Sequence, residues 1–221
     1  MDIDLAPIID NWRFLAAGAM LTIVLSGAAM AGSLTLGGLT GLARAYGPRW
    51  LTVPLTFYVD SMRAVPVLVV LVWTFFAFPI LTGLTLPSFW AALVALTVHL
   101  AAYVSEIVRA GIGSIRPGQM RAALALGMSG PQAVRKIILP QALVRMLPAF
   151  GSVLSITIKD TAIASVIAVP ELMRQSETIA GQSFRPFEVF TTTMLCFLLI
   201  LFPVTRGVDA IYRRIAHLGR S

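Results

Sequence analysis

Long uncharged stretches alternate along the chain with short segments rich in arginine. Residues 14–43 and 64–105 contain no Asp, Glu, Lys or Arg, and two shorter apolar stretches follow them. A helix needs about 20 apolar residues to cross the hydrocarbon core of a bilayer, so residues 64–105 are long enough for two spans. The prolines and glycine of "FPILTGLTLPS" (78–88) are typical of a turn between those two spans. The pattern therefore predicts an all-α membrane protein, a single domain over 1–221, with five transmembrane helices at about 14–43, 62–79, 88–108, 146–168 and 189–208.

The first apolar stretch is too long to be the core of a signal peptide. A signal peptide begins with basic residues followed by roughly 7–15 apolar ones, whereas the acidic segment "MDIDLAPIIDNWR" precedes the run 14–43. As a helix, that run is about 45 Å long, which exceeds a hydrocarbon core of about 30 Å. We therefore expect a retained transmembrane helix that tilts, bends or protrudes, with glycines that allow close packing against a neighbour.

Composition and charge agree with a membrane protein and set its orientation. Hydrophobic residues make up 57% of the chain and charged residues only 12%, against about a quarter charged in an ordinary globular domain. The net charge of +7 does not indicate a nucleic-acid partner here, because the basic residues lie in the connections between spans. Cytoplasmic loops are enriched in Lys and Arg, which predicts an N-terminus outside and a C-terminus in the cytoplasm. The basic residues expected inside are Arg44, Arg49, Arg63, Arg109, Arg116, Arg121, Arg135, Lys136, Arg145, Arg206, Arg213, Arg214 and Arg220, against Arg13, Arg174 and Arg185 outside.

The predicted cytoplasmic connection between the third and fourth spans, 116–141, is less apolar than its surroundings. Residues 118–128 are rich in alanine and predict a short helix. Gly130-Pro131 ends that helix and is suited to begin a second one, whose end we place at Pro140. Small residues with some exposed apolar surface are typical of a docking helix, and equally of an interfacial helix that lies on the membrane.

Several motifs, taken in order, resemble the permease subunits of ABC importers. In the cytoplasmic loop, the spacing of Arg121-Ala122-Ala123, Gly127 and Ile137-x-Leu139-Pro140 resembles the EAA motif of that family, with Arg121 at the position where the motif prefers Glu. Further segments are similar to the polar amino acid permeases of the histidine, glutamine, glutamate and arginine type. These segments are "YVDSMRAVPVLVVL", "AAYVSEIVRAGIGSI", "GQMRAALALGM", "IILPQA", "IKDTAIASVI" and "SFRPFEVF", so the resemblance extends over about 57–190.

The resemblance implies a multi-pass subunit of the bacterial inner membrane that works with several partners. These are a second permease subunit, identical or homologous, two separate ATPase subunits and an external substrate-binding protein that delivers an amino acid. It also implies a coupling helix that docks on the ATPase through Arg121, Ala122, Ala123, Gly127 and Met128. A salt bridge made by the family's Glu is not expected at Arg121. ATP and Mg are expected on the partner ATPases, so this chain is not expected to be an enzyme or to hold a cofactor or metal, and it contains no P-loop motif G-x-x-x-x-G-K-[ST].

Two charged residues interrupt the predicted fourth span. A charge at the bilayer centre costs roughly 2.5–3.5 kcal/mol on insertion scales, so Lys159 and Asp160 indicate a functional site. Adjacent helix positions point about 100° apart, which disfavours a pair between these two residues alone. An amino acid carries an ammonium and a carboxylate, and we expect Asp160, Lys159 and the hydroxyls of Thr157 and Thr161 to border the substrate pathway. A structural role between helices is the alternative.

Other polar residues suggest structural roles. Glu106 and Arg109 are spaced i, i+3 and predict an ion pair on one helix face. Arg63 is expected to anchor its helix at the membrane interface, and His99 has no second histidine nearby to share a metal. The external segment 170–188 predicts a short helix over the mouth of the pathway or a contact with a binding protein, with a solvated loop as the alternative.

Two other classes of function stay open from the residues alone. An ion-coupled secondary transporter would use Lys159 and Asp160 but would not need the cytoplasmic helices. An intramembrane hydrolase would need a nucleophile with a base, and no such constellation is evident in the sequence. Cys196 is the only cysteine, which excludes a disulfide within the chain.

Overall fold

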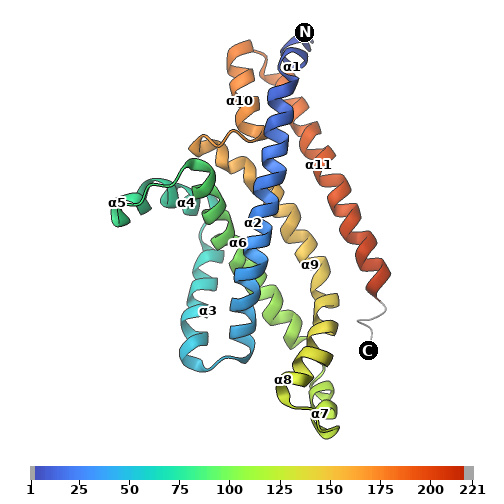
Figure 1. Ribbon diagram of the computed structural model, residues 1–221. Helices are drawn as coiled ribbons and strands as arrows, with labels where there is room; N and C mark the ends of the chain where they lie inside the picture. The colour runs from blue at the N-terminus through green and yellow to red at the C-terminus, as the bar shows by residue number, and fades with distance from the viewer. Residues whose placement is uncertain (1–2, 217–221) are drawn as a thin grey trace.

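The computed structural model describes residues 3–216, and every regular element in that part of the chain is a helix (Figure 1). Four helical segments are long and apolar enough to cross a membrane, and a bent pair of helices makes a fifth if it counts as one span. The long segments are α2 (Trp12–Tyr46), α6 (Ser88–Gly113), Gly130–Ile167, which contains α9 (Leu139–Asp160), and α11 (Pro186–Ile215). The prediction of an all-α membrane fold is confirmed.

Shorter elements connect and extend these helices. The N-terminal α1 (Ala6–Asp10) and α10 (Leu172–Ser183) lie at one end of the molecule, while α7 (Pro117–Ala125) and α8 (Gly130–Ala133) lie at the other (Figure 1). The remaining elements are α3 (Arg49–Ala64), α4 (Val67–Val72), the π-helical η1 (Trp73–Ala77), α5 (Phe78–Thr82), the π-helical η2 (Val134–Ile138) and the 3-10 helix η3 (Thr161–Ile167).

The bent pair is broken at a proline. Helix α3 and the helical segment Val67–Thr82 meet at 107°. Val65, between them, has φ −90° and ψ 133°, because a residue before proline is driven out of the helical region. The predicted second span, 62–79, therefore lies on both sides of the bend. Helix α3 runs beside α2, while α4 and α5 lead away from the bundle (Figure 1).

At Pro140, unlike at Pro66, the chain stays helical. The expectation that Pro140 ends a helix was wrong, because α8, η2 and α9 follow one another without a break. Proline lacks an N–H and its ring crowds the carbonyl four residues back. The π turn of η2 ends two residues before Pro140, as η1 ends two residues before Pro79, and this wider turn makes room for the ring. The predicted start at Gly130-Pro131 is confirmed, with Ser129 and Gln132 forming a capping box.

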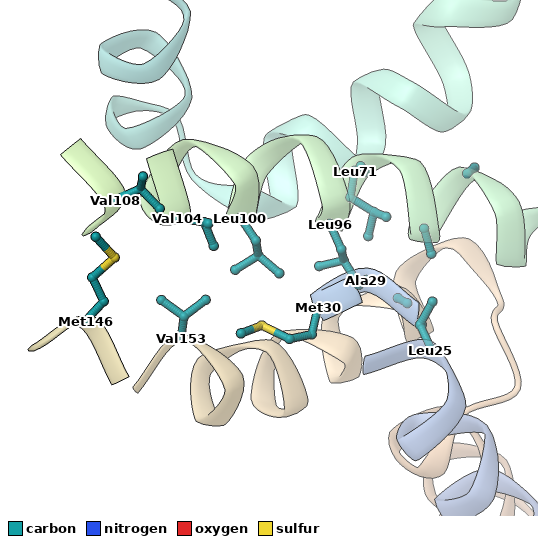
Figure 2. Close-up of a cluster of buried hydrophobic side chains, with 14 of the residues drawn as sticks. Leu25, Ala29, Met30, Leu71, Leu96, Leu100, Val104, Val108, Met146 and Val153 are labelled. Carbon is teal, nitrogen blue, oxygen red and sulfur yellow. The ribbon is translucent and has the colours of Figure 1, made fainter. Parts of the chain in front are cut away.

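Small residues allow α2 and α6 to pack closely. A Cβ atom on Gly37 would lie 2.5 Å from the carbonyl oxygen of Ala101, and one on Gly41 would lie 2.7 Å from that of Ser105. Side chains of α2, α6, α9 and α4 then meet in one apolar cluster (Figure 2). Its labelled members are Leu25, Ala29, Met30, Leu71, Leu96, Leu100, Val104, Val108, Met146 and Val153. The central packing unit is therefore α2, α6 and α9, and the other helices attach to it.

The segment 170–188 forms a helix, as one of the alternatives predicted. Helix α10 packs against α2 and α11 through a smaller apolar cluster that includes Leu15, Leu172 and Ile179. Glu171 caps the helix: its carboxylate accepts hydrogen bonds from the N–H groups of Met173 at 2.9 Å and Arg174 at 2.8 Å. The capping residue is fully buried, which is unusual for a carboxylate.

This buried cap predicts a stability that depends on pH. Burial raises the pKa of Glu171 to about 7, although the two backbone hydrogen bonds lower it. An unfolded glutamate titrates near 4.3, so the folded state binds the proton more tightly. The free energy of unfolding is then highest below about pH 4.5 and falls, by on the order of 3 kcal/mol, as the pH rises to about 7. We expect the melting temperature of the solubilised protein to fall over this interval.

The variant Glu171→Gln keeps an acceptor oxygen for the cap but cannot titrate. It should flatten the dependence of the melting temperature on pH, whereas the exposed Asp10→Asn should leave the dependence unchanged. An equal pH dependence in wild type and Glu171→Gln would contradict this assignment.

Candidate functional site

A cavity of about 420 Å³ lies beside the bend that separates α3 from α4. The bend at Pro66 ends α3 there, and faces of α6 and α9 complete the wall. The lining residues are Arg63, Ala64, Val65, Pro66, Val67, His99, Leu100, Tyr103, Val153, Ile156 and Asp160. Volumes of this size are typical of small-molecule sites.

The cavity wall carries one basic and one acidic side chain that are not paired. The guanidinium of Arg63 lies over the ring of Tyr103, 5.9 Å from its centroid. Among residues 3–216, neither Arg63 nor Asp160 forms an ion pair or a hydrogen bond through its side chain. Asp160 is half-buried, and a partly buried charge without a partner is costly. Both charges are therefore available to a ligand in the cavity.

His99 adds a polar group that the protein leaves unsatisfied. Its side chain is 5% exposed and lies on α6 beside Tyr103, with ring centroids 5.4 Å apart. Its Nδ1 atom is buried and has no hydrogen-bond partner within the described part of the chain. Buried polar atoms are nearly always paired, so the imidazole of this cavity-lining residue keeps an unsatisfied hydrogen-bonding group.

Of the four residues predicted to border a substrate pathway, only Asp160 lines the cavity. Thr157 and Thr161 are fully buried. Their hydroxyls donate to backbone carbonyls of their own helical segment, at 2.8 and 2.7 Å. Lys159 is exposed on another face of α9. The two adjacent side chains thus lie on different faces of the helix, and Asp160 lies where α9 narrows into the 3-10 turn of η3.

Three residues of the cavity wall, Arg63, His99 and Tyr103, were not predicted to border the pathway. Arg63 lines the cavity in addition to the anchoring role expected for it at the membrane interface, which stays a prediction. His99 and Tyr103 are spaced i, i+4 on α6, so they share a helix face. That spacing was the available signal, together with the position of Arg63 three residues before Pro66.

A cluster around Glu106 joins three helices. The predicted pair of Glu106 with Arg109 is confirmed, with Nε of Arg109 3.1 Å from Oε2 of the carboxylate. Arg44 of α2, whose side chain is 5% exposed, donates to the same oxygen at 3.0 Å. It also donates to the hydroxyls of Ser105 and Thr56, both at 3.3 Å. Arg44, considered before only as a loop charge, therefore ties α2 to α3 and α6 and holds the helix that carries Arg63.

Helix α7, in the connection between α6 and α8, ends in a Schellman motif. Gly127 has φ +80°, and its N–H donates to the carbonyl of Leu124 at 3.0 Å. The N–H of Met128 donates to the carbonyl of Ala123 at 3.2 Å, which completes the motif. Glycine suits this position because it adopts a positive φ without a Cβ clash.

The tip of this loop exposes apolar side chains. Leu126 is 84% exposed and Leu124 is 48% exposed, while Arg121 and Ala122 are exposed beside them. Only Ala123 of α7 is buried. The loop tip thus presents two leucine side chains beside small residues, which suits contact with a partner protein or with the membrane surface.

Comparisons with known proteins agree on one family. Residues 33–217 match the family described as binding-protein-dependent transport system inner membrane component. The chain is 37% identical over 203 residues to the glutamine transport system permease protein GlnP of Escherichia coli (strain K12), which covers 90% of this chain and 92% of that protein. It is 34% identical over 209 residues to the probable glutamine ABC transporter permease protein GlnM of Bacillus subtilis (strain 168), with 93% and 95% covered.

A solved structure shows the same fold. The crystal structure of an amino acid ABC transporter with histidines contains a chain that superposes with a TM-score of 0.90 at 29% sequence identity. The match covers 97% of this chain and 100% of that one.

Proposed function

Because the chain belongs to the family of binding-protein-dependent transport system inner membrane components, and is thus a permease subunit of an ABC importer, we propose that it carries a polar amino acid through its cavity. Membership in this family favours an importer over an ion-coupled transporter or an intramembrane hydrolase. The relatives in the comparison are named for glutamine, L-cystine, arginine or amino acids. The observation that carries the substrate class is the pair of unpartnered opposite charges in one cavity wall.

The two charges complement a zwitterion. The planar guanidinium of Arg63 would bind the α-carboxylate through two parallel hydrogen bonds, and the carboxylate of Asp160 would bind the ammonium. Leu100, Val153 and Ile156 add apolar surface to the same wall, and a substrate that covers this surface would strengthen both interactions by displacing water. Neither charge then stays uncompensated when the substrate is bound.

The other proposed pathway residues act around Asp160. Thr157 and Thr161 bond to their own backbone and would position the end of α9, and so the Asp160 carboxylate. Lys159, on the exposed face of α9, would border the pathway from the side that a second permease subunit, identical or homologous, completes. The pair of permeases would receive the amino acid from an external substrate-binding protein.

The loop 116–141 would couple transport to ATP hydrolysis. We place it in the cytoplasm, with the N-terminus outside and the C-terminus inside, and two ATPase subunits, which bind ATP and Mg, would dock on α7. The contact would use Arg121, Ala122, Ala123, Gly127 and Met128, and this chain would have no catalytic site of its own. The exposed leucines at the loop tip support the contact.

A continuous helix offers the mechanical link. From Gly130 the chain stays helical through η2 and α9 to Asp160, a length of roughly 45 Å at 1.5 Å per residue. Closure of the ATPases would displace α7 and α8, and the helix would transmit that displacement to the cavity wall. Asp160 would then change its position relative to Arg63 on α3. This movement would open the cavity first to one side of the membrane and then to the other.

The coupling proposal predicts the effect of a single loop substitution. Gly127→Asp should reduce the amount of ATPase that co-purifies with the solubilised permease at least tenfold. No atom lies within 4 Å of a Cβ built on Gly127, so the cost within this chain is only the backbone strain of about 1–2 kcal/mol. A larger effect has to come from the lost contact with the partner.

Gly181→Asp is the matched control. Gly181 is also exposed with no atom within 4 Å of a built Cβ, but it lies on α10 at the other end of the molecule. It should leave the ATPase bound. Normal recovery of ATPase with Gly127→Asp would remove the proposed docking role of this residue.

A further inference from the structure

The buried imidazole of His99 remains unexplained by charge complementarity alone. Arg63 and Asp160 account for the two charged groups that all amino acids share. His99 lines the same cavity, is 5% exposed, and keeps Nδ1 unpaired among residues 3–216. Leaving a buried nitrogen without a partner is unfavourable, and a rotation of the ring that brings this nitrogen to a molecule in the cavity would remove that cost.

The surroundings of His99 limit what that molecule is. Tyr103 packs against one side of the imidazole and also carries the guanidinium of Arg63 over its ring. The charged groups in the cavity wall are Arg63 and Asp160, and apart from His99 and Tyr103 the remaining side chains of the wall are apolar. Once the backbone of an amino acid occupies both charges, no countercharge remains for a charged side chain.

We propose that His99 recognises the side chain of the transported amino acid, and that the cavity selects a neutral side chain carrying a primary amide, as in glutamine or asparagine. The inference rests on the proposed function, in which Arg63 and Asp160 hold the carboxylate and the ammonium. A neutral imidazole has one N–H donor and one acceptor nitrogen, and a primary amide likewise donates and accepts. Rotation about the Cβ–Cγ bond of His99 exchanges Nδ1 with Cδ2 while the ring keeps its place, so the ligand can satisfy this nitrogen.

Other side chains fit less well for stated reasons. A glutamate side chain only accepts hydrogen bonds and brings a further negative charge into a cavity that already holds Asp160. A methionine side chain fits in length but leaves the His99 nitrogen unpaired. An arginine side chain brings a positive charge that has no free carboxylate to meet, because Asp160 holds the ammonium.

The test measures binding selectivity with the permease–ATPase complex, purified without the external binding protein. Labelled L-glutamine is the probe, and L-glutamate and L-methionine are competitors. His99→Phe keeps an aromatic ring and removes both nitrogens, and it should lower the preference for glutamine over methionine about 10- to 100-fold. Methionine binding should be unchanged or tighter. The melting temperature should be unchanged or higher, because an apolar ring replaces an unpaired buried nitrogen.

The outcomes separate this inference from the function on which it rests. If Arg63→Gln and Asp160→Asn abolish binding while His99→Phe keeps the glutamine preference, the cavity is the substrate site and the role of His99 is overturned. If His99→Phe lowers the melting temperature and weakens glutamine and methionine equally, His99 is structural and the inference fails. If none of the three substitutions changes binding, the proposed substrate site itself fails. Wild-type protein without a preference for glutamine over methionine would also overturn the inference.

Discussion

Asp160→Asn should reduce amino acid uptake by the reconstituted importer about 30- to 5,000-fold. In the proposed site, Asp160 is the only acidic side chain of the cavity wall, and it has no ion-pair partner among the described residues. Removing its charge leaves the substrate ammonium in a largely apolar cavity without a countercharge. Truncating one member of a buried charge pair typically costs 2–5 kcal/mol. The measurement is uptake of labelled L-glutamine into proteoliposomes at matched protein content, with binding protein, ATPase and ATP present.

Two further variants, one inside the cavity and one outside it, serve as comparisons for Asp160→Asn. Arg63→Gln should cause a loss of similar size, because the α-carboxylate loses its partner in turn. Asp60→Asn removes an exposed carboxylate from α3, outside the cavity lining, and should leave uptake within about twofold of wild type. Unchanged uptake with Asp160→Asn would refute the substrate site, provided that the variant is inserted and folded like wild type.

Gly37→Leu should destabilise the protein by at least about 3 kcal/mol. A Cβ on Gly37 would lie 2.5 Å from the carbonyl oxygen of Ala101 and 2.6 Å from Cβ of Val104, both on α6. The backbone of α6 cannot yield as a flexible side-chain end can, so α2 has to move away and open the apolar cluster that joins α2, α6 and α9. For a protein of this size the melting temperature should fall by roughly 6–12 °C, with a lower yield of monodisperse protein.

Gly38→Leu is the matched control, one position along the same helix. No atom lies within 4 Å of a Cβ built on Gly38, and leucine favours a helix more than glycine does. The melting temperature should therefore be unchanged or slightly higher. Equal losses at both positions would show that the close approach of α2 to α6 is not what makes Gly37 intolerant of a side chain.

The helical framework follows from the local sequence. In hydrocarbon, backbone N–H and C=O groups have to be paired within the protein, so long apolar runs such as 14–43 and 189–208 are restricted to helices. Short-range features were equally predictable, such as the pair of Glu106 with Arg109 and the helix start at Gly130-Pro131. Each of these depends only on residues within one or two helical turns of each other.

Two prolines show where local reasoning fails. Before Pro66 the helix breaks and the chain turns by 107°, whereas before Pro140 a π turn lets the helix continue. The local chemistry of the two sites is the same, and the cost of a proline inside a helix is about 3 kcal/mol. We infer that packing against neighbouring helices decides whether the helix continues through the proline or breaks before it.

The sequence by itself determined that the chain is an all-helical membrane protein and that its motifs resemble those of an importer permease, and it singled out Asp160 as a candidate for the substrate pathway. Only the tertiary structure decided which other residues line the cavity together with Asp160. It brings Arg63 and His99 to the same cavity from α3 and α6, and it leaves Lys159 outside the cavity lining. The reason is that a binding site depends on which helix faces meet. That choice is made by close contacts between distant segments, such as Gly37 against Ala101, and not by the pattern along any one helix.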